Sequence, residues 1–198
     1  IKTAADLIAL NDAISNNVSY DDYTIYFDND IDMGGVEWES MNGLFLYNAV
    51  FEGNGHTISN LNIVPNRFNT ARVGFIDQVY GENITFRNIT FKNFTTTGGN
   101  TNGVATIIGY AQKTTVSFNN VHVLDSKVIT DTKYQTGASD NSIGIRIAAF
   151  VGYSHEGSEI TIDSCSVKNF EAEGFHNLAC FVGYDSAWLT SLKNSVAE

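Results

Sequence analysis

The chain has 198 residues, of which 43% are hydrophobic and 12% aromatic, and it carries a formal net charge of −11. This length and apolar content suit one folded domain with a substantial core rather than a disordered segment. Such an acidic chain lacks the basic surface that binds nucleic acid or anionic lipid, and no apolar run approaches the roughly 20 residues of a membrane helix. We therefore expect no nucleic-acid partner and no membrane insertion. The abundance of Asp, Asn, Thr and Gly is typical of an extracellular protein.

Residues 4–15 form the one convincing helix in the sequence. Thr3 is suited to cap its N-terminus, and Asp6 stands three residues later in the capping-box position. One apolar stripe runs along this helix, made by Leu7, Leu10, Ala13 and Ile14. We expect residues 1–16 to cap a β-structure by covering its first edge, which would otherwise invite aggregation.

Short β-strands are predicted between residues 17 and 72, where the pattern is irregular. The strand regions are 23–27, 29–33 and 43–50, and the segment 51–63 follows with a tight turn marked by Gly53 and Gly55. The first two alternate apolar and polar side chains, as half-buried strands do. The glycine pair Gly34–Gly35 breaks the second run. We assign 17–72 to the first, irregular turns of the fold.

One short apolar block recurs four times after residue 72. Its copies are Gly74–Gln78, Thr106–Tyr110, Ala149–Tyr153 and Cys180–Tyr184. The residues that head the register are 32, 43 and 31 positions apart: Phe75, Ile107, Phe150 and Phe181. A repeat of this length is one supersecondary unit that cannot bury its own apolar face, so neighbouring copies must stack. Residues 73–198 are therefore predicted to form regular repeats.

A second alternating segment follows each block and bends once in its middle. The bends fall at Arg87–Asn88, Asn119–Asn120, Asp163–Ser164 and Lys193–Asn194. Asn and Asp suit such corners because they tolerate the left-handed backbone conformation and bond to the local backbone. Each repeat thus offers about three short strands and no helix, which excludes helical repeats, and it is too short for a propeller blade. We predict a single all-β domain over 1–198, a parallel β-helix of about five to six rungs.

The long interval between the second and third blocks places an insertion at residues 131–145. This stretch is polar, and we expect it to protrude from one corner of the coil as a loop. Its residues Lys133, Tyr134 and Asp140 are candidates for contact with a partner.

The blocks at Ile108–Tyr110, Phe150–Tyr153 and Phe181–Tyr184 resemble the GLUG motif of bacterial surface proteins. The N-terminal half is similar to the usual entry to such regions, with its helix, its Asp30–Asp32 strand and its Phe51–Leu61 turn. The resemblance implies a right-handed parallel β-helix in a long secreted or wall-attached, adhesin-like protein. Some members are immunoglobulin A protease-like, with the β-helix as an accessory region, and the family has no established catalytic residues to transfer. The first block departs from the motif, because Asp77 stands where later copies have Gly.

Two sets of side chains are candidates for ligand binding. Asp28, Asp30 and Asp32 occupy alternate positions, roughly 6–7 Å apart on one strand face, and with Glu39 they are the candidate ligands for calcium. The alternative is an ordinary solvated strand face. The second set recurs at one repeat position: Tyr110, Tyr153 and Tyr184. We expect these rings to form a ladder, which is either a platform for sugars and partner side chains or a stack that stabilises one face of the solenoid.

Both faces of the repeated block are apolar. One column holds Phe75, Ile107, Phe150 and Phe181, and the other holds Ile76, Ile108, Val151 and Val182. Because a coil has one interior, we expect something outside the coil to cover one of these columns.

Two cysteines are present, Cys165 and Cys180. The first stands where other repeats have Ile89 and Val121, which predicts a small buried hydrophobic residue. A disulfide between the two cysteines is the alternative.

These features predict a non-catalytic, extracellular β-helix module of a cell-surface, adhesin-like protein that presents loops and faces for binding. Its expected partners are neighbouring domains of the same polypeptide and host or cell-surface glycans or proteins, with calcium as the one candidate cofactor. One alternative is a glycan-binding or polysaccharide-degrading β-helix, but the arginines that a lyase needs are scattered: Arg67, Arg72, Arg87 and Arg146. Another alternative is an accessory domain of a larger secreted protease. The repeat stops without a terminal cap, so we expect these residues to be part of a longer protein.

Overall fold

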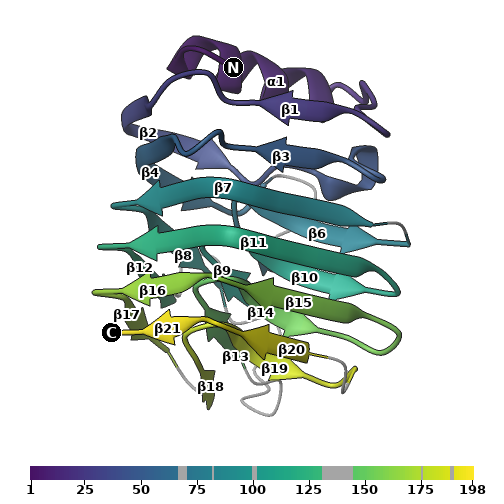
Figure 1. Ribbon diagram of the computed structural model, residues 1–198, viewed down its shortest axis with the longest axis vertical. Helices are drawn as coiled ribbons and strands as arrows, with labels where there is room; N and C mark the ends of the chain where they lie inside the picture. Colours follow the sequence, from purple (N-terminus) through teal and green to yellow (C-terminus); the bar gives the residue numbers. More distant parts are fainter. Residues whose placement is uncertain (67–70, 82, 100–101, 131–144, 175, 188–189) are drawn as a thin grey trace.

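The computed structural model describes residues 1–66, 71–81, 83–99, 102–130, 145–174, 176–187 and 190–198. Within them, one helix precedes strands that stack into a parallel β-helix, with the N-terminus at one end of the stack and the C-terminus near the other (Figure 1). The strands that pair across the stack run parallel throughout. The predicted all-β solenoid with an N-terminal helix is therefore confirmed.

The strands belong to three sheets, and the helix is α1 (Ala4–Ser15). The largest sheet holds β1 (Thr24–Tyr26), β2 (Ile31–Glu39), β3 (Val50–Glu52), β4 (Thr57–Val64), β7 (Ile84–Lys92), β8 (Thr95–Gly98), β11 (Thr115–Leu124), β12 (Lys127–Thr130), β15 (Glu159–Asp163), β16 (Ser166–Lys168), β17 (Glu171–Glu173), β20 (Thr190–Lys193) and β21 (Val196–Ala197). The block sheet, named for the repeated block, holds β6 (Ile76–Tyr80), β10 (Ile108–Gln112), β14 (Val151–Ser154) and β19 (Val182–Asp185). The short-strand sheet holds β5 (Arg72–Val73), β9 (Gly103–Ala105), β13 (Ile145–Ala148) and β18 (His176–Leu178).

Six strands of the largest sheet form one column, with one strand for each turn of the coil. Their order is β1, β3, β7, β11, β15 and β20. Matched residues continue one apolar row through this column: Ile25, Phe51, Phe86, Phe118, Ile162 and Leu192. The rings of Phe51 and Phe86 stack with their centroids 4.8 Å apart, which is the spacing of neighbouring strands. The core is thus a ladder of equivalent side chains, and its six turns agree with the predicted five to six.

Helix α1 closes the N-terminal end of the stack. The Thr3 hydroxyl accepts a hydrogen bond from the Asp6 N–H at 3.2 Å, and the Asp6 carboxylate accepts one from the Thr3 N–H at 3.0 Å. This reciprocal pair is the predicted capping box. Leu7, Leu10 and Ile14 are buried in the common core, so the apolar stripe covers the first turn as expected.

Asparagine side chains form ladders at the corners of the coil. The predicted corner residues have left-handed backbones, with φ of 54° at Asn88 and 53° at Asn120. The Asn120 amide donates to the Asn88 side-chain oxygen at 3.0 Å, and a second corner repeats this contact between Asn93 and Asn60 at 2.6 Å. Each bond of this kind contributes about 1 kcal/mol and fixes the stacking of one turn on the next.

Two expectations for the first turns are wrong. Residues 43–50 do not form a strand, because a 3₁₀ helix, η1 (Gly43–Phe45), occupies their start and β3 begins only at Val50. The Gly43 N–H donates to the Asp77 carboxylate at 3.2 Å, which holds this segment against the first copy of the block. The Gly34–Gly35 pair does not end its strand either, since β2 passes through it with a register shift between Asp32 and Val36.

The expectation that something outside the coil covers one face of the block is also wrong for the first three copies. Both columns are fully buried there, with Phe75 and Ile76 at 0% exposure, and both belong to one core cluster. The described chain therefore buries both faces of these copies, and the short-strand sheet lies against the block sheet where Gly109 and Gly152 closely approach β5 and β9. The last copy differs, because Phe181 and Val182 are partly exposed.

Neither cysteine forms a disulfide. Cys165 is buried at 2% exposure, as the expectation of a small hydrophobic residue requires, whereas Cys180 is exposed. The disulfide alternative is therefore not realised in this structure.

Candidate functional site

The glycine of the repeated block sets the distance between two sheets. A Cβ atom built on Gly109 would lie 2.5 Å from the Val73 nitrogen, and one built on Gly152 would lie 2.6 Å from the Val104 nitrogen. Real Cβ atoms do not approach backbone atoms so closely, so only glycine lets the short-strand sheet lie against the block sheet. This contact brings side chains from the two sheets together along one line.

The predicted tyrosine ladder lies beside this contact. Tyr110, Tyr153 and Tyr184 occupy matched positions on β10, β14 and β19. Their ring centroids are 5.3 Å apart between the first two rings and 5.4 Å apart between the last two. Such tilted and edge-on pairs are the favoured geometries for aromatic rings. The expectation of a ladder is confirmed.

Two arginines from the short-strand sheet lie over the tyrosine rings. The Arg72 guanidinium carbon is 3.9 Å from the Tyr110 centroid, and that of Arg146 is 4.1 Å from Tyr153 and 5.0 Å from Tyr184. Each cation–π contact of a partly desolvated arginine is worth about 1–2 kcal/mol. We call these five side chains the tyrosine–arginine column.

Polar groups extend this column on β10 and after β14. The Tyr110 hydroxyl donates to the Gln112 side-chain oxygen at 3.0 Å, and the Gln112 amide nitrogen lies 3.1 Å from His155 Nδ1. The His155 ring in turn lies 5.2 Å from the Tyr153 ring. A shallow depression of about 500 Å³ opens here, lined by Tyr153, His155, Glu156, Ser186 and Ala187.

Exposure divides the column into a structural end and an open end. Tyr110 is only 5% exposed, and burial raises the pKa of its phenol. Tyr153 is half-buried, whereas Tyr184 is 42% exposed. The ladder therefore stabilises the contact between the sheets at Tyr110, and its most exposed ring is that of Tyr184, which also lies near the Arg146 guanidinium.

In the first copy of the block, a buried aspartate stands at the position that glycine holds in the later copies. Asp77 is 2% exposed and accepts hydrogen bonds from the Gly43 N–H and, at 2.9 Å, from the Asn66 side-chain amide. Burial penalises the charged form and raises the pKa of Asp77 to about 6. Strand β6 still pairs in register with β10, so the departure from the motif leaves the path of the strand unchanged.

The four acidic candidates for calcium are exposed and bind different neighbours. Asp30 accepts from the Thr57 N–H at 2.9 Å, and hydrogen bonds from that N–H and from His56 lower its pKa. Asp32 accepts from the Asn60 amide at 2.7 Å as part of a corner ladder. Asp28 lies 4.0 Å from the Lys2 ammonium, and Glu39 ends β2. Among the residues described by the structure, no three acidic, His or Cys side chains form a group that could hold a metal.

The loop candidates Lys133, Tyr134 and Asp140 lie outside the described residues. Sequence reasoning missed the partners of the tyrosines, which are Arg72, Arg146 and His155. A weak signal was present, because an arginine precedes the first aromatic residue of the block by three or four positions in the first and third copies. The sequence did not predict the short-strand sheet, whose strands place both arginines next to the block sheet.

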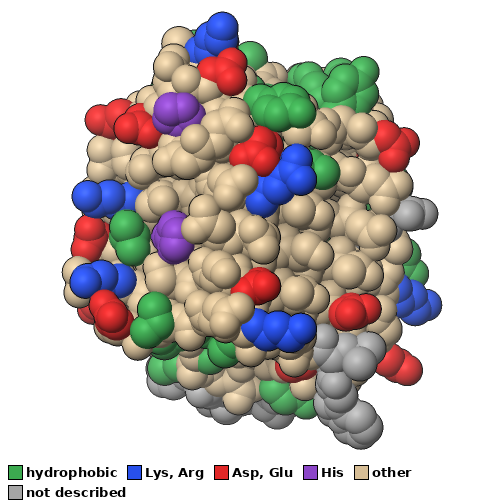
Figure 2. Space-filling view, in the orientation of Figure 1, with side chains coloured by type: hydrophobic (Ala, Val, Ile, Leu, Met, Phe, Trp, Pro, Cys, Tyr) green, Lys and Arg blue, Asp and Glu red, His purple; other side chains and the backbone are tan. Residues whose placement is uncertain are grey.

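The outer face of the largest sheet is polar and mostly uncharged. Its matched residues on consecutive strands are Thr85, Ser117, Thr161 and Ser191. Figure 2 shows this face, on which a few acidic and basic side chains, some of them next to one another, stand on a surface of mostly uncharged groups. The ion pair between Arg87 on β7 and Glu52 on β3 is one such contact. This face therefore resembles an ordinary solvated sheet more than a charged binding site.

No family model, curated protein or solved structure matches the chain. The likeness to the GLUG motif accordingly stays a prediction from the sequence. Within the described ranges, no helix is long and apolar enough to cross a membrane.

Proposed function

We propose that this chain is a non-catalytic β-helix module of an extracellular, adhesin-like protein, and that the open end of its tyrosine–arginine column binds cell-surface glycans. The observation that carries the proposal is the depression lined by Tyr153, His155 and Ser186, beside which the Tyr184 ring continues the ladder. Ligand sites typically combine aromatic walls with a few polar groups that fix orientation. The Tyr184 ring would stack on a sugar face, while His155 and Ser186 would bond to its hydroxyl groups.

The scaffold supports this role because it holds the open end in place. The tyrosine–arginine column and the glycines of the block join two sheets. The asparagine ladders connect the corners of successive turns. A site on such a rigid framework binds with little loss of conformational entropy.

An array of cell-surface glycans probed with the chain tests the proposal. We expect the wild-type chain to bind a subset of glycans and the Tyr184→Ala variant to bind them about tenfold more weakly, since one aromatic stacking contact is worth about 1–1.5 kcal/mol. Tyr26→Ala is the matched control, because Tyr26 is 52% exposed on β1 at the opposite end of the stack. Absence of binding across the array, or equal binding by both variants, would contradict the proposal.

A further inference from the structure

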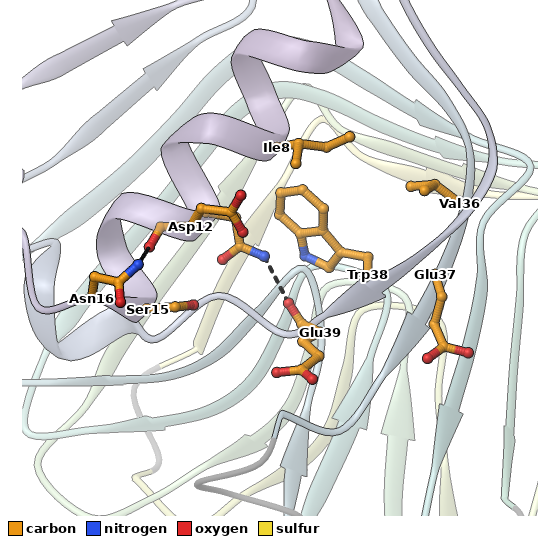
Figure 3. A pocket seen from close by; sticks show the side chains of 9 residues that line it. Ile8, Asp12, Ser15, Asn16, Val36, Glu37, Trp38 and Glu39 are labelled. Carbon is orange, nitrogen blue, oxygen red and sulfur yellow. Dashed lines mark hydrogen bonds between the residues drawn. The ribbon is translucent and has the colours of Figure 1, made fainter.

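A groove separates helix α1 from strand β2 at the N-terminal end of the stack. It has a volume of about 450 Å³ and is lined by Ile8, Asn11, Asp12, Ser15, Asn16, Val36, Glu37, Trp38 and Glu39 (Figure 3). The helix contributes one wall and the strand contributes the other. The groove lies at the end of the stack opposite to Tyr184, so it is independent of the proposed glycan site.

The groove is acidic and also partly apolar. Asp12, Glu37 and Glu39 are exposed at its walls, and no lysine, arginine or histidine lines it. In the part of the chain that the structure describes, none of these three carboxylates forms an ion pair with a basic side chain. Ile8 and Val36 are 36% and 37% exposed beside them. A complementary ligand therefore carries positive charge together with some apolar surface.

A buried acceptor in the groove wall has no donor. Asn11 is only 8% exposed, and its amide nitrogen donates to the Glu39 carbonyl at 2.9 Å. That bond fixes the orientation of the amide, because a carbonyl accepts only from the nitrogen end. The Asn11 side-chain oxygen is left buried without a hydrogen-bond partner. Buried acceptors normally have partners, so this atom points to a ligand that supplies an N–H group.

Among the described residues, one edge of strand β2 pairs with no other strand, and this free edge lies beside the same groove. It pairs on one side with β4, and its Glu39 carbonyl points the other way, toward α1. In a parallel pair, backbone groups alternate between the two edges, so Glu37 presents its N–H and C=O toward the groove as well. The Glu37 and Glu39 side chains share one face of the strand, roughly 6–7 Å apart.

We propose that this groove binds an extended segment of a partner protein that carries lysine or arginine at alternating positions. The segment lies along the free edge of β2, and its basic side chains face Glu37, Glu39 and Asp12. One of its N–H groups reaches the Asn11 oxygen. Strand addition of this kind obtains affinity from the backbone and specificity from alternate side chains.

Peptide binding to the full chain tests this inference. The probe is a short, fluorescently labelled peptide that alternates lysine and threonine, and its charge-reversed counterpart alternates glutamate and threonine. We expect the lysine peptide to bind at low salt with weaker binding at high salt, and the glutamate peptide not to bind. Failure of the wild-type chain to bind the lysine peptide would overturn the inference.

A matched pair of variants separates the groove from general acidity. The groove variant combines Asp12→Asn, Glu37→Gln and Glu39→Gln, and the control variant combines Glu159→Gln, Glu171→Gln and Glu173→Gln, which are exposed residues toward the C-terminal end. Both remove three negative charges. We expect about tenfold weaker binding by the groove variant and little change in the control. If both variants bound the lysine peptide equally weakly, binding would depend only on the net charge of the chain, and the proposed site would be refuted.

Backbone amide chemical shifts of the wild-type chain give a test without substitutions. The lysine peptide should shift the amides of α1 and of Val36–Glu39 and leave those of β19 unchanged. Shifts spread over the whole acidic surface would contradict the inference.

Discussion

The buried carboxylate of Asp77 should make the stability of the folded chain depend on pH. Folding raises its pKa from 3.8 to about 6, chiefly because burial penalises the charged form. The folded state therefore holds this proton more tightly than the unfolded state does. The contribution of Asp77 to stability is most favourable below about pH 4 and declines as the pH rises through about 6. A shift of about two pKa units corresponds to about 3 kcal/mol between these limits.

Urea unfolding of the wild-type chain and the Asp77→Asn variant, followed by circular dichroism from pH 4 to pH 8, isolates this effect. The variant has no titrating group at this position, and both proteins share the other carboxylates, such as Asp32, whose lowered pKa acts in the opposite direction. The free energy of unfolding of the wild type, relative to that of the variant, should fall by about 3 kcal/mol with rising pH and level off above about pH 7. Parallel pH profiles for the two proteins would refute the reasoning.

Three further substitutions test the scaffold by thermal or urea unfolding. Gly152→Ala should cost about 3 kcal/mol, because its Cβ would lie 2.6 Å from the Val104 nitrogen; a loss below about 1 kcal/mol would mean that the two sheets separate easily. Asn120→Ala should cost about 2 kcal/mol, since it loses the bond to Asn88 and strains a left-handed backbone, whereas Asn120→Gly should cost about 1 kcal/mol less; equal losses would exclude the strain. Thr3→Ala should cost about 1 kcal/mol and Thr3→Ser almost nothing, and equal losses would remove the capping role.

The fold could be predicted because its evidence is repeated in the sequence. The block recurs with Phe75, Phe150 and Phe181 in one register, so three independent copies support the same stacked strand. The helix at Ala4–Ser15 carries a capping box and an apolar stripe, which act locally and need no knowledge of the rest of the chain. Local chemistry and periodicity were sufficient for these elements.

The short-strand sheet could not be predicted, for a physical reason. Its strands are as short as Arg72–Val73 and Gly103–Ala105, which is too few residues to show alternation. The arginine partners of the tyrosine ladder depend on this sheet, because Arg72 lies on β5 and Arg146 lies on β13. The 3₁₀ helix at Gly43–Phe45 could not be predicted either, because a hydrogen bond to Asp77, which is distant in the sequence, holds it in place.

The sequence predicted the tyrosine ladder of the candidate site but not the exposure of its rings. The tyrosines recur at one repeat position, so their ladder follows from the register of the strands. Their unequal exposure does not follow, because Tyr110 is buried under neighbouring turns while Tyr184 lies in the last copy. The groove between α1 and β2 also lay beyond sequence reasoning, since it depends on how the cap sits against the first turn.

Titration of the chain with the tightest-binding array glycan, followed by analysis of the recovered glycan, tests the central claim most directly. The account predicts saturable binding at one site per chain, loss of that binding in Tyr184→Ala, and a glycan recovered intact. New reducing ends or unsaturated sugar products in the recovered glycan, or unchanged binding by the variant, would contradict a non-catalytic module that binds through the open end of its tyrosine–arginine column.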